Sequence, residues 1–308
     1  MLLSFLPIPD QASTQAVSVD TLFLVFTALV VFFTVLVCVV LIIFSIKYTR
    51  GTKADRSNPL DGSLKLEIMW SVIPLFLAIG AFGWASHVYF EMVHPPADAM
   101  EIHVVGRQWM WKIQHPTGQR EINELHVPVG RPVKLTMTSQ DVIHSFFIPA
   151  FRVKQDVVPG TYSQLWFEAT KPGTYHLFCA EYCGTEHSRM IGSVVVMEPQ
   201  AYEEWLQSGT TSESMVAAGE RLFRDKGCSG CHAGTSSVRA PILNGVYGGP
   251  VPLDDGSVVT ADDMYMRDSI LLPKKQVAAG FKPIMPTYQG QLSEEELFQL
   301  IAYIKTLK

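Results

Sequence analysis

The chain has 308 residues, a formal net charge of −5 at pH 7, and 48% hydrophobic residues. This length suffices for at least two domains of ordinary size, and the modest acidity gives no reason to expect nucleic acid as a partner. Much of the hydrophobic content lies in two N-terminal runs, so the chain does not have the composition of a wholly soluble protein.

Those two runs predict a pair of transmembrane helices. Leu22 to Ile46 and Ile68 to Phe90 contain no Asp, Glu, Lys or Arg, and each exceeds the ~20 residues that span a bilayer. The alternative is a buried core helix, but such helices are rarely so long and uncharged. We expect an external leader over residues 1–20 and a membrane region over 21–92, with helices at about 21–47 and 66–90.

The positive charges near these runs predict their orientation. The segment before the first run has no Lys or Arg, and none follows the second run until Arg107. The intervening loop carries Lys47, Arg50, Lys53, Arg56 and Lys65. Cytoplasmic loops are enriched in such residues, so we expect this loop inside and both flanks outside. A basic region typical of a signal peptide is missing before the first run, which favours a retained anchor.

Short alternating segments separated by Gly and Pro follow from about Ala97. Strand-like patterns occupy residues 101–105, 124–129, 132–137 and 193–197, and several short strands with turns between them predict a β-sandwich or barrel. We place this domain at 93–206, a polar linker at 207–213 and a helical domain at 214–308. Ser293 before three Glu residues predicts the start of the final helix.

One loop of the β-domain is rich in soft metal-binding side chains. Cys179, Cys183, His187 and Met190 lie close together in sequence, and His144 lies upstream. Thiolates, imidazoles and a thioether suit copper, and two bridging sulfurs can hold two copper ions that share one electron. A disulfide or a zinc site is the alternative, although neither explains a His and a Met at these positions.

This loop closely resembles the dicopper (CuA) loop of cytochrome c oxidase subunit II. The resemblance implies a cupredoxin-like fold in which Cys179 and Cys183 bridge the two coppers. It further implies that His144 and His187 each bind one copper, that Met190 binds one weakly, and that Glu181 offers its backbone carbonyl to the other.

A second redox motif lies in the helical domain. Cys228, Cys231 and His232 match the Cys-x-x-Cys-His attachment site of c-type haem. The two thiols can reach the two vinyl groups of the porphyrin, and the adjacent His is then placed as an axial ligand. Gly219 and Tyr303 resemble the pattern of small c-type cytochromes, in which the terminal helices cross closely.

The other axial ligand should be a downstream methionine. Met285, between two prolines, is the favoured candidate, and Met264 and Met266 are the alternatives. Ligation by His and Met raises the haem potential and leaves no open site for oxygen, which suits electron transfer.

Further roles are implied by the resemblance to subunit II. Trp109 would be an electron-entry residue, with packing in the sandwich as the alternative. The side chain of Glu181 would help bind magnesium at the boundary with subunit I, since Mg²⁺ prefers oxygen ligands. Glu67, a carboxylate at the cytoplasmic start of the second helix, would mark the mouth of a proton path, with a solvated helix-end charge as the alternative. Six remaining histidines are read as surface or strand residues and not as ligands: His87, His94, His103, His115, His126 and His176.

Taken together, nearly the whole chain resembles oxidase subunit II with a fused class I cytochrome c domain. This implies the electron-input subunit of a haem–copper terminal oxidase, with oxygen reduction and proton pumping in subunit I. Expected partners are subunits I and III, membrane lipid, and cytochrome c or a quinol-oxidising complex as donor. The expected location is the bacterial cytoplasmic membrane, with both redox domains on the periplasmic side.

Alternative functions explain fewer of these features. Nitrous oxide reductase shares the dicopper loop but would need a second, His-rich copper domain. A membrane-anchored copper carrier or assembly factor would not need covalent haem, and a quinol oxidase subunit would lack the copper ligands. A membrane-anchored copper and haem carrier that serves another reductase is the remaining alternative.

Overall fold

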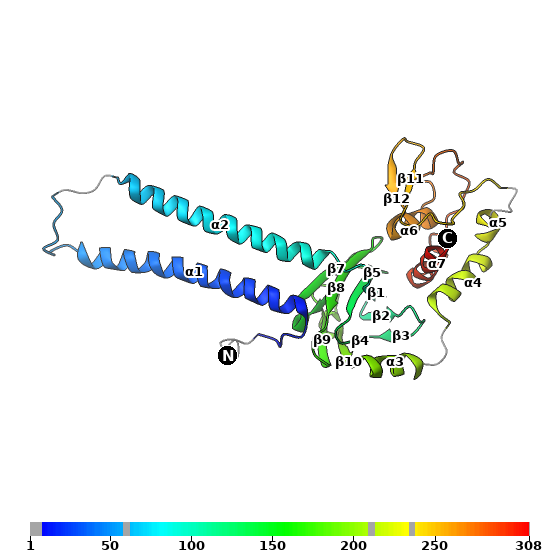
Figure 1. Ribbon diagram of the computed structural model, residues 1–308, viewed down its shortest axis with the longest axis horizontal. Helices are drawn as coiled ribbons and strands as arrows, with labels where there is room; N and C mark the ends of the chain where they lie inside the picture. Colours follow the sequence, from blue (N-terminus) through cyan, green and yellow to red (C-terminus); the bar gives the residue numbers. More distant parts are fainter. Residues whose placement is uncertain (1–7, 58–61, 209–212, 234–237, 308) are drawn as a thin grey trace. The chain divides into compact units, whose positions relative to one another are not determined.

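The computed structural model describes residues 8–57, 62–208, 213–233 and 238–307. The chain divides into two compact units (Figure 1). One unit is the helical pair over Thr14–His94, and the other combines the residues before Thr14 with everything from Pro95 onward.

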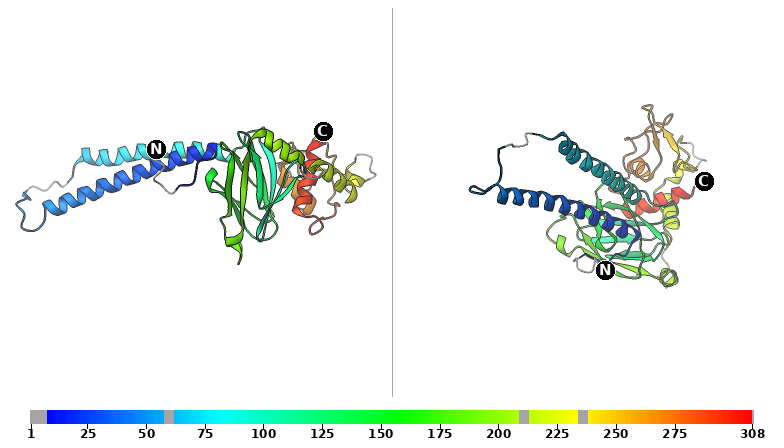
Figure 2. Two further views of the ribbon diagram at one scale, coloured as in Figure 1. Left: turned by 90° about the horizontal axis from the view of Figure 1, so that it is seen from below. Right: turned by 60° about the vertical axis from the view of Figure 1, so that its left-hand side comes forward.

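The helical pair consists of α1 (Thr14–Lys47) and α2 (Leu64–Val93), which run antiparallel (Figure 2). Both helices are long and apolar enough to cross a membrane, since each contains an 18-residue window whose mean hydropathy is 3.3 in α1 and 1.8 in α2. The helix α1 begins before the expected start at residue 21, because the polar residues that precede the apolar run include neither Gly nor Pro to end a helix. Part of the connecting loop and the first seven residues of the expected leader, 58–61 and 1–7, lie outside the described residues.

The second unit contains the predicted β-sandwich. One sheet has the order β3-β2-β1-β5-β8, and the other has the order β4-β10-β9-β6-β7. The strands of the first sheet are β1 (Met100–Arg107), β2 (Met110–Gln114), β3 (Arg120–Ile122), β5 (Pro132–Ser139) and β8 (Ser163–Glu168). Those of the second are β4 (Glu124–Pro128), β6 (His144–Ile148), β7 (Val153–Val157), β9 (Gly173–Cys179) and β10 (Ile191–Met197). Short 3₁₀ turns, η2 (Pro149–Phe151) and η3 (His187–Arg189), lie in the connections.

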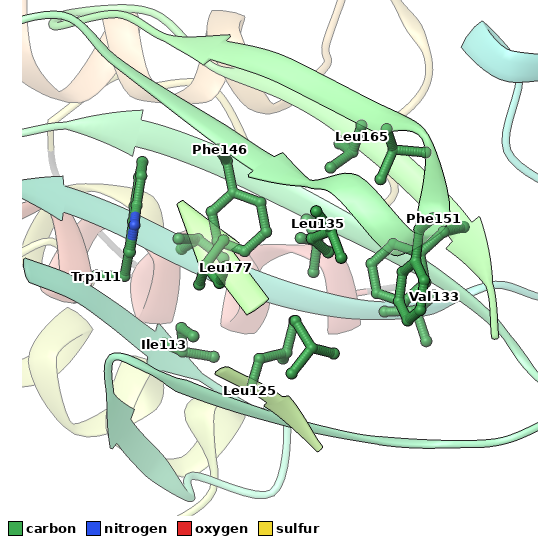
Figure 3. Packing of buried hydrophobic residues seen from close by; sticks show 14 of the residues in the cluster. Trp111, Ile113, Leu125, Val133, Leu135, Phe146, Phe151, Leu165 and Leu177 are labelled. Carbon is green, nitrogen blue, oxygen red and sulfur yellow. The ribbon is translucent and has the colours of Figure 1, made fainter. Parts of the chain in front are cut away.

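The core of the sandwich forms where the inward-facing residues of the two sheets meet (Figure 3). Trp111 from one sheet and Phe146 from the other are fully buried, with ring centroids 5.0 Å apart in an edge-to-face arrangement. Such aromatic pairs stabilise a core beyond the area they bury. Ala12, from the segment before α1, is also fully buried in this core.

The helical domain follows α3 (Pro199–Ser208). Its helices are α4 (Met215–Asp225), α5 (Ser229–His232), α6 (Asp263–Leu271) and α7 (Glu294–Thr306), and a small ribbon joins β11 (Pro250–Pro252) to β12 (Val258–Thr260). Most of the predicted linker, 209–212, lies outside the described residues, so its bounds stay a prediction.

The sequence signals for the ends of this domain are confirmed. Ser293 and Glu296 form a reciprocal capping box at the start of α7. A Cβ on Gly219 of α4 would overlap the carbonyl oxygen of Gln299 on α7, so only glycine permits this crossing. The rings of Phe223 and Tyr303 pack across it, with centroids 5.4 Å apart.

Candidate metal and haem sites

Neighbouring strands bring the cysteine loop and His144 together. His144 begins β6 and Cys179 ends β9, and these two strands pair in the same sheet, with Phe146 opposite Cys179. The backbone amide of Cys179 donates to the carbonyl of Met190, which closes the loop onto itself. The sheet therefore fixes both ends of the loop.

Inside this loop the predicted donor atoms converge. The two Sγ atoms of Cys179 and Cys183 are 3.8 Å apart, and His144 Nδ1 lies 3.9 Å from Cys179 Sγ. On the other side, Cys183 Sγ lies 3.4 Å from His187 Nδ1 and 3.7 Å from Met190 Sδ.

The backbone completes this donor set. The carbonyl oxygen of Glu181 lies 3.3 Å from Cys179 Sγ, whereas the Glu181 side chain is exposed. His144, Cys179, Cys183 and Met190 are all buried. Two sulfurs flanked by two imidazoles and a thioether fit copper ions better than a hard cation.

The two thiols of the cluster differ in how readily they ionise. Burial opposes ionisation of Cys179, but hydrogen bonds from His144 and from the backbone lower its pKa. Burial and the neighbouring Cys179 thiolate raise the pKa of Cys183. A bound cation would remove this conflict, because it stabilises both thiolates at once.

Three residues without a predicted metal-ligating role support the loop. Asp141 Oδ1 lies 2.8 Å from His144 Nε2, so Nδ1 of that ring is left to face the sulfurs. Gln108 Nε2 and Trp109 Nε1 both donate to the carbonyl of Cys183, at 2.8 and 3.2 Å. The Asp three residues before His144 was the available sequence signal, whereas the contact of Gln108 crosses 75 positions and left no local pattern.

Gly184 allows the close approach of these two side chains. Its φ is +118°, and a Cβ there would lie 2.9 Å from Gln108 Nε2 and 3.3 Å from the Trp109 ring. Trp109 is thus half-buried against the loop that carries the thiols, a position compatible with both electron entry and packing.

The Cys-x-x-Cys-His motif lines an apolar cavity in the helical domain. Cys228 precedes α5, whereas Cys231 and His232 lie within it. All three border a cavity of about 400 Å³, together with Tyr265 and Met285. A mostly apolar pocket of this size is typical of a ligand or cofactor site.

The orientation of His232 suits an axial ligand. Its Nδ1 lies 2.8 Å from the carbonyl oxygen of Pro241, so Nδ1 carries the proton and Nε2 is left with a free lone pair. Met285 and Met266 both line the cavity. Met264 instead accepts a hydrogen bond from the backbone amide of Tyr162 at 3.3 Å, which favours Met285 and Met266 over Met264.

Two of the remaining histidines form a separate network. Glu121 binds His115 Nε2 at 2.7 Å and His126 Nδ1 at 2.6 Å, and Trp205 of α3 stacks on His126 with a centroid distance of 4.4 Å. His115 is fully buried and therefore is not a surface residue. Glu124 and His126 lie close enough to Glu121 to suggest a metal group, but both Glu121 oxygens already bind imidazoles, so the cluster is satisfied without an ion.

Glu67 lies in the first turn of α2, whose N-cap is Ser63. Its backbone amide donates to the Ser63 carbonyl at 2.9 Å, and its side chain is exposed. This position is compatible with both of its predicted roles.

Comparison with known proteins matches three family models to consecutive parts of the chain. The transmembrane domain of cytochrome c oxidase subunit II matches residues 3–83, its periplasmic domain matches 117–198, and cytochrome c matches 216–308. A subunit II periplasmic domain implies a CuA copper centre, and a cytochrome c domain implies haem c.

Relatives match most of the chain. Cytochrome c oxidase subunit 2 of Alkalihalophilus pseudofirmus is 29% identical, over 89% of this chain and 82% of its own length. That of Thermostichus vulcanus is 31% identical, over 64% of this chain and 77% of its own length. The solved periplasmic domain of subunit II of the Bradyrhizobium japonicum cytochrome oxidase is 30% identical over 37% of this chain and 96% of its own, with a TM-score of 0.36. The chain therefore belongs to the cytochrome c oxidase subunit II family, with a C-terminal cytochrome c domain.

Proposed function

We propose that this chain is the electron-input subunit of a haem–copper terminal oxidase. It would relay electrons from a donor through haem c to a dicopper CuA centre and on to haem in subunit I, where oxygen is reduced to water with proton pumping. The observation that carries this proposal is the convergence of two thiols, two imidazoles and a thioether where the cysteine loop meets His144 of β6.

The cysteine loop would hold two copper ions. Cys179 and Cys183 are the proposed bridging ligands, His144 and His187 the terminal imidazoles, and Met190 and the Glu181 carbonyl the weak ligands. Bound copper and haem supply reversible one-electron transfer. The role of the protein is to keep these donor atoms rigid, which the paired strands and the Asp141–His144 contact support.

The cavity of the helical domain would hold one haem c. Cys228 and Cys231 are the proposed thioether anchors, and His232 and Met285 the proposed axial ligands. The hydrogen bond between His232 and Pro241 orients the imidazole, and the apolar walls exclude water from the iron.

Three further residues receive proposed roles. Trp109 is the candidate electron-entry residue, because its indole nitrogen donates to the carbonyl of Cys183. The exposed Glu181 carboxylate would contribute to a magnesium site shared with subunit I, and Glu67 would lie at the mouth of a proton path into that subunit. The proposed partners are subunits I and III, with cytochrome c or a quinol-oxidising complex as donor. The proposed location is the bacterial cytoplasmic membrane, with both redox domains in the periplasm.

Replacement of single ligands tests the copper assignment. His187→Ala and Met190→Leu should abolish or distort the copper absorption and paramagnetic resonance spectra while the haem c spectrum stays intact. Met197→Leu, on the following strand β10, is the matched control and should leave both spectra unchanged. A native copper spectrum in His187→Ala would refute the proposed ligand set.

Replacement of one thiol tests the haem assignment. Cys231→Ala should leave haem attached through a single thioether, a loss that the pyridine haemochrome spectrum detects, while the copper domain stays folded. Cys38→Ala, in the apolar helix α1, is the matched control. If Cys231→Ala were still cross-linked through two thioethers, the assignment would be wrong.

A further inference from the structure

The cytochrome c domain packs against one sheet of the copper domain through a small apolar centre. Val105 of β1, Met215 of α4 and Phe298 of α7 are all buried in one cluster. The ring of Phe298 lies between Tyr162 and His103, with centroid distances of 4.9 and 4.4 Å. The aromatic residue is only 2% exposed, so the two domains share a closed contact here.

Ion pairs and a hydrogen bond also connect the two domains beside this apolar centre. Lys305 of α7 reaches Glu101 of β1 at 3.2 Å, and Glu101 also binds Lys134 of β5 at 2.9 Å. Arg267 of α6 donates to the carbonyl of Gly160 at 3.1 Å. An apolar centre with a polar rim is the usual anatomy of a specific protein interface.

One edge of this rim reaches the segment that precedes His144. Glu295 of α7 accepts from Lys112 Nζ at 2.8 Å and from Gln140 Nε2 at 2.9 Å, and Lys112 also lies 3.4 Å from Gln140 Oε1. The next residue, Asp141, binds His144 Nε2 at 2.8 Å. Two side-chain contacts and one peptide unit therefore connect the cytochrome c domain to a proposed copper ligand.

The same contact leaves the haem cavity free. Along α6, Met264 and Arg267 contact the copper domain, whereas Tyr265, Met266 and Ser269 line the cavity. Because successive helical positions point to different faces, α6 can hold the interface with one side and the cofactor site with the other.

We propose that the α6–α7 face docks specifically on β1, β2 and the segment from Gly160 to Tyr162, and that Gln140 and Glu295 are positioning residues that connect docking with His144. This inference rests on the proposed function, because it takes His144 to be a copper ligand. Docking would then fix the orientation of the haem domain and the position of the His144 ring together.

The test uses the full-length chain loaded with copper and haem. Gln140→Ala removes the amide that binds Glu295 but keeps the backbone contact of residue 140 with Gly106. Gln200→Ala is the matched control, because it removes a Gln–Glu side-chain contact of 3.0 Å within α3. Elemental analysis and absorption spectra first establish the metal content of each variant.

Three readouts are then compared: the rate of electron exchange between haem and copper after flash reduction, the copper paramagnetic resonance spectrum, and hydrogen exchange in α7. Gln140→Ala should slow the exchange of electrons at least about threefold, the size expected for coupling between residues in contact. It should also change the copper hyperfine splitting and increase hydrogen exchange in α7. Glu295→Ala should produce changes at least as large, because it also removes the contact with Lys112, and the double variant should add little to Glu295→Ala, since the Gln140–Glu295 contact is already lost there.

The outcomes separate this inference from the proposed function. Full copper and haem content in Gln140→Ala, with rate, spectrum and hydrogen exchange equal to those of Gln200→Ala, would overturn the positioning role alone. A wild-type chain that binds no copper would overturn the proposed function, and this inference with it.

Discussion

The two candidate redox sites of this chain are built in different ways. Cys179, Cys183 and Met190 belong to the hydrophobic core of the β-sandwich, where the sulfur of Cys183 lies 3.8 Å from that of Cys179 and 3.7 Å from that of Met190. The haem motif instead borders a cavity of about 400 Å³, and Cys228 lies at the margin of the helical core.

This difference between a filled core and a cavity indicates which of the two domains depends on its cofactor for stability. A sandwich whose strands pair and whose core is filled does not need copper to complete its packing. The small helical domain has a cavity of about 400 Å³ beside its core residues, so we expect bound haem to complete its packing. The sites are therefore expected to respond differently to loss of the cofactor and to substitution.

The largest expected effect follows from omission of each cofactor in turn. Haem would fill a cavity of about 400 Å³, and its omission would remove packing contacts along the apolar lining that are large compared with the stability of a small domain. Without haem, residues 214–308 should lose protection from hydrogen exchange. Without copper, residues 93–206 should keep theirs.

One result would contradict the expected difference between the two domains. Protection of α4 and α7 in the haem-free chain at the level of the loaded chain would show that the helical domain does not depend on its cofactor.

A smaller effect on stability is expected where the backbones of α4 and α7 approach each other closely. Gly219→Ala would push a Cβ into the carbonyl of Gln299, at a cost of about 3 kcal/mol or more. Thermal unfolding of the haem domain, followed by the Soret band, should shift to lower temperature while the copper spectrum is unaffected. Gly192→Ala in the sandwich, which would overlap the carbonyl of Asn123, should destabilise the copper domain instead.

The control for the haem-domain variant is Val216→Ala. Val216 lies on the same helix and is 38% exposed, so its truncation should change stability by less than about 0.5 kcal/mol. Equal shifts in Gly219→Ala and Val216→Ala would contradict the close helix crossing.

The smallest expected effect is the weakening of the contact between the copper domain and the cytochrome c domain at low pH. The pKa of His103 is lowered to about 4, mainly because the side chain is buried; Glu101 and Asp263 oppose this shift, and Lys305 and Lys134 add to it. Because the folded pKa lies below the ordinary value of about 6.5, the docked state favours neutral His103. This stabilisation is complete above pH ~6.5 and is lost as the pH falls toward about 4.

The loss should amount to roughly 2–3 kcal/mol across that window. Hydrogen exchange of β1 and α7, measured between pH 7 and 4, is the readout. His103→Gln cannot gain a proton and should remove most of the dependence above pH ~4.5. Glu101 contributes below that value. Burial raises its pKa, but Lys305 and other neighbours lower it to about 2, so protonation of Glu101 causes a further loss of stability as the pH falls. An unchanged pH profile in His103→Gln would exclude His103 as the titrating group.

Short sequence motifs, and the family that they resemble, predicted both candidate ligand sets, although His144 and Met285 lie far along the chain from those motifs. Cys179 to Met190 forms one loop and Cys228 to His232 one turn, so the residues stay together whatever the rest of the chain does. The same holds for the two apolar runs and for the Ser293 cap, whose signals are local.

Only the tertiary structure decided how those local units are supported and joined. Gln108 meets the copper loop across 75 positions, Lys112 meets Glu295 across 183, and Lys305 meets Glu101 across 204. His103 was predicted to be an ordinary surface or strand histidine, and it is a buried strand residue at a domain contact. Local spacing fixes which atoms can bind a metal, whereas burial and long-range pairing depend on which surfaces the folded chain brings together.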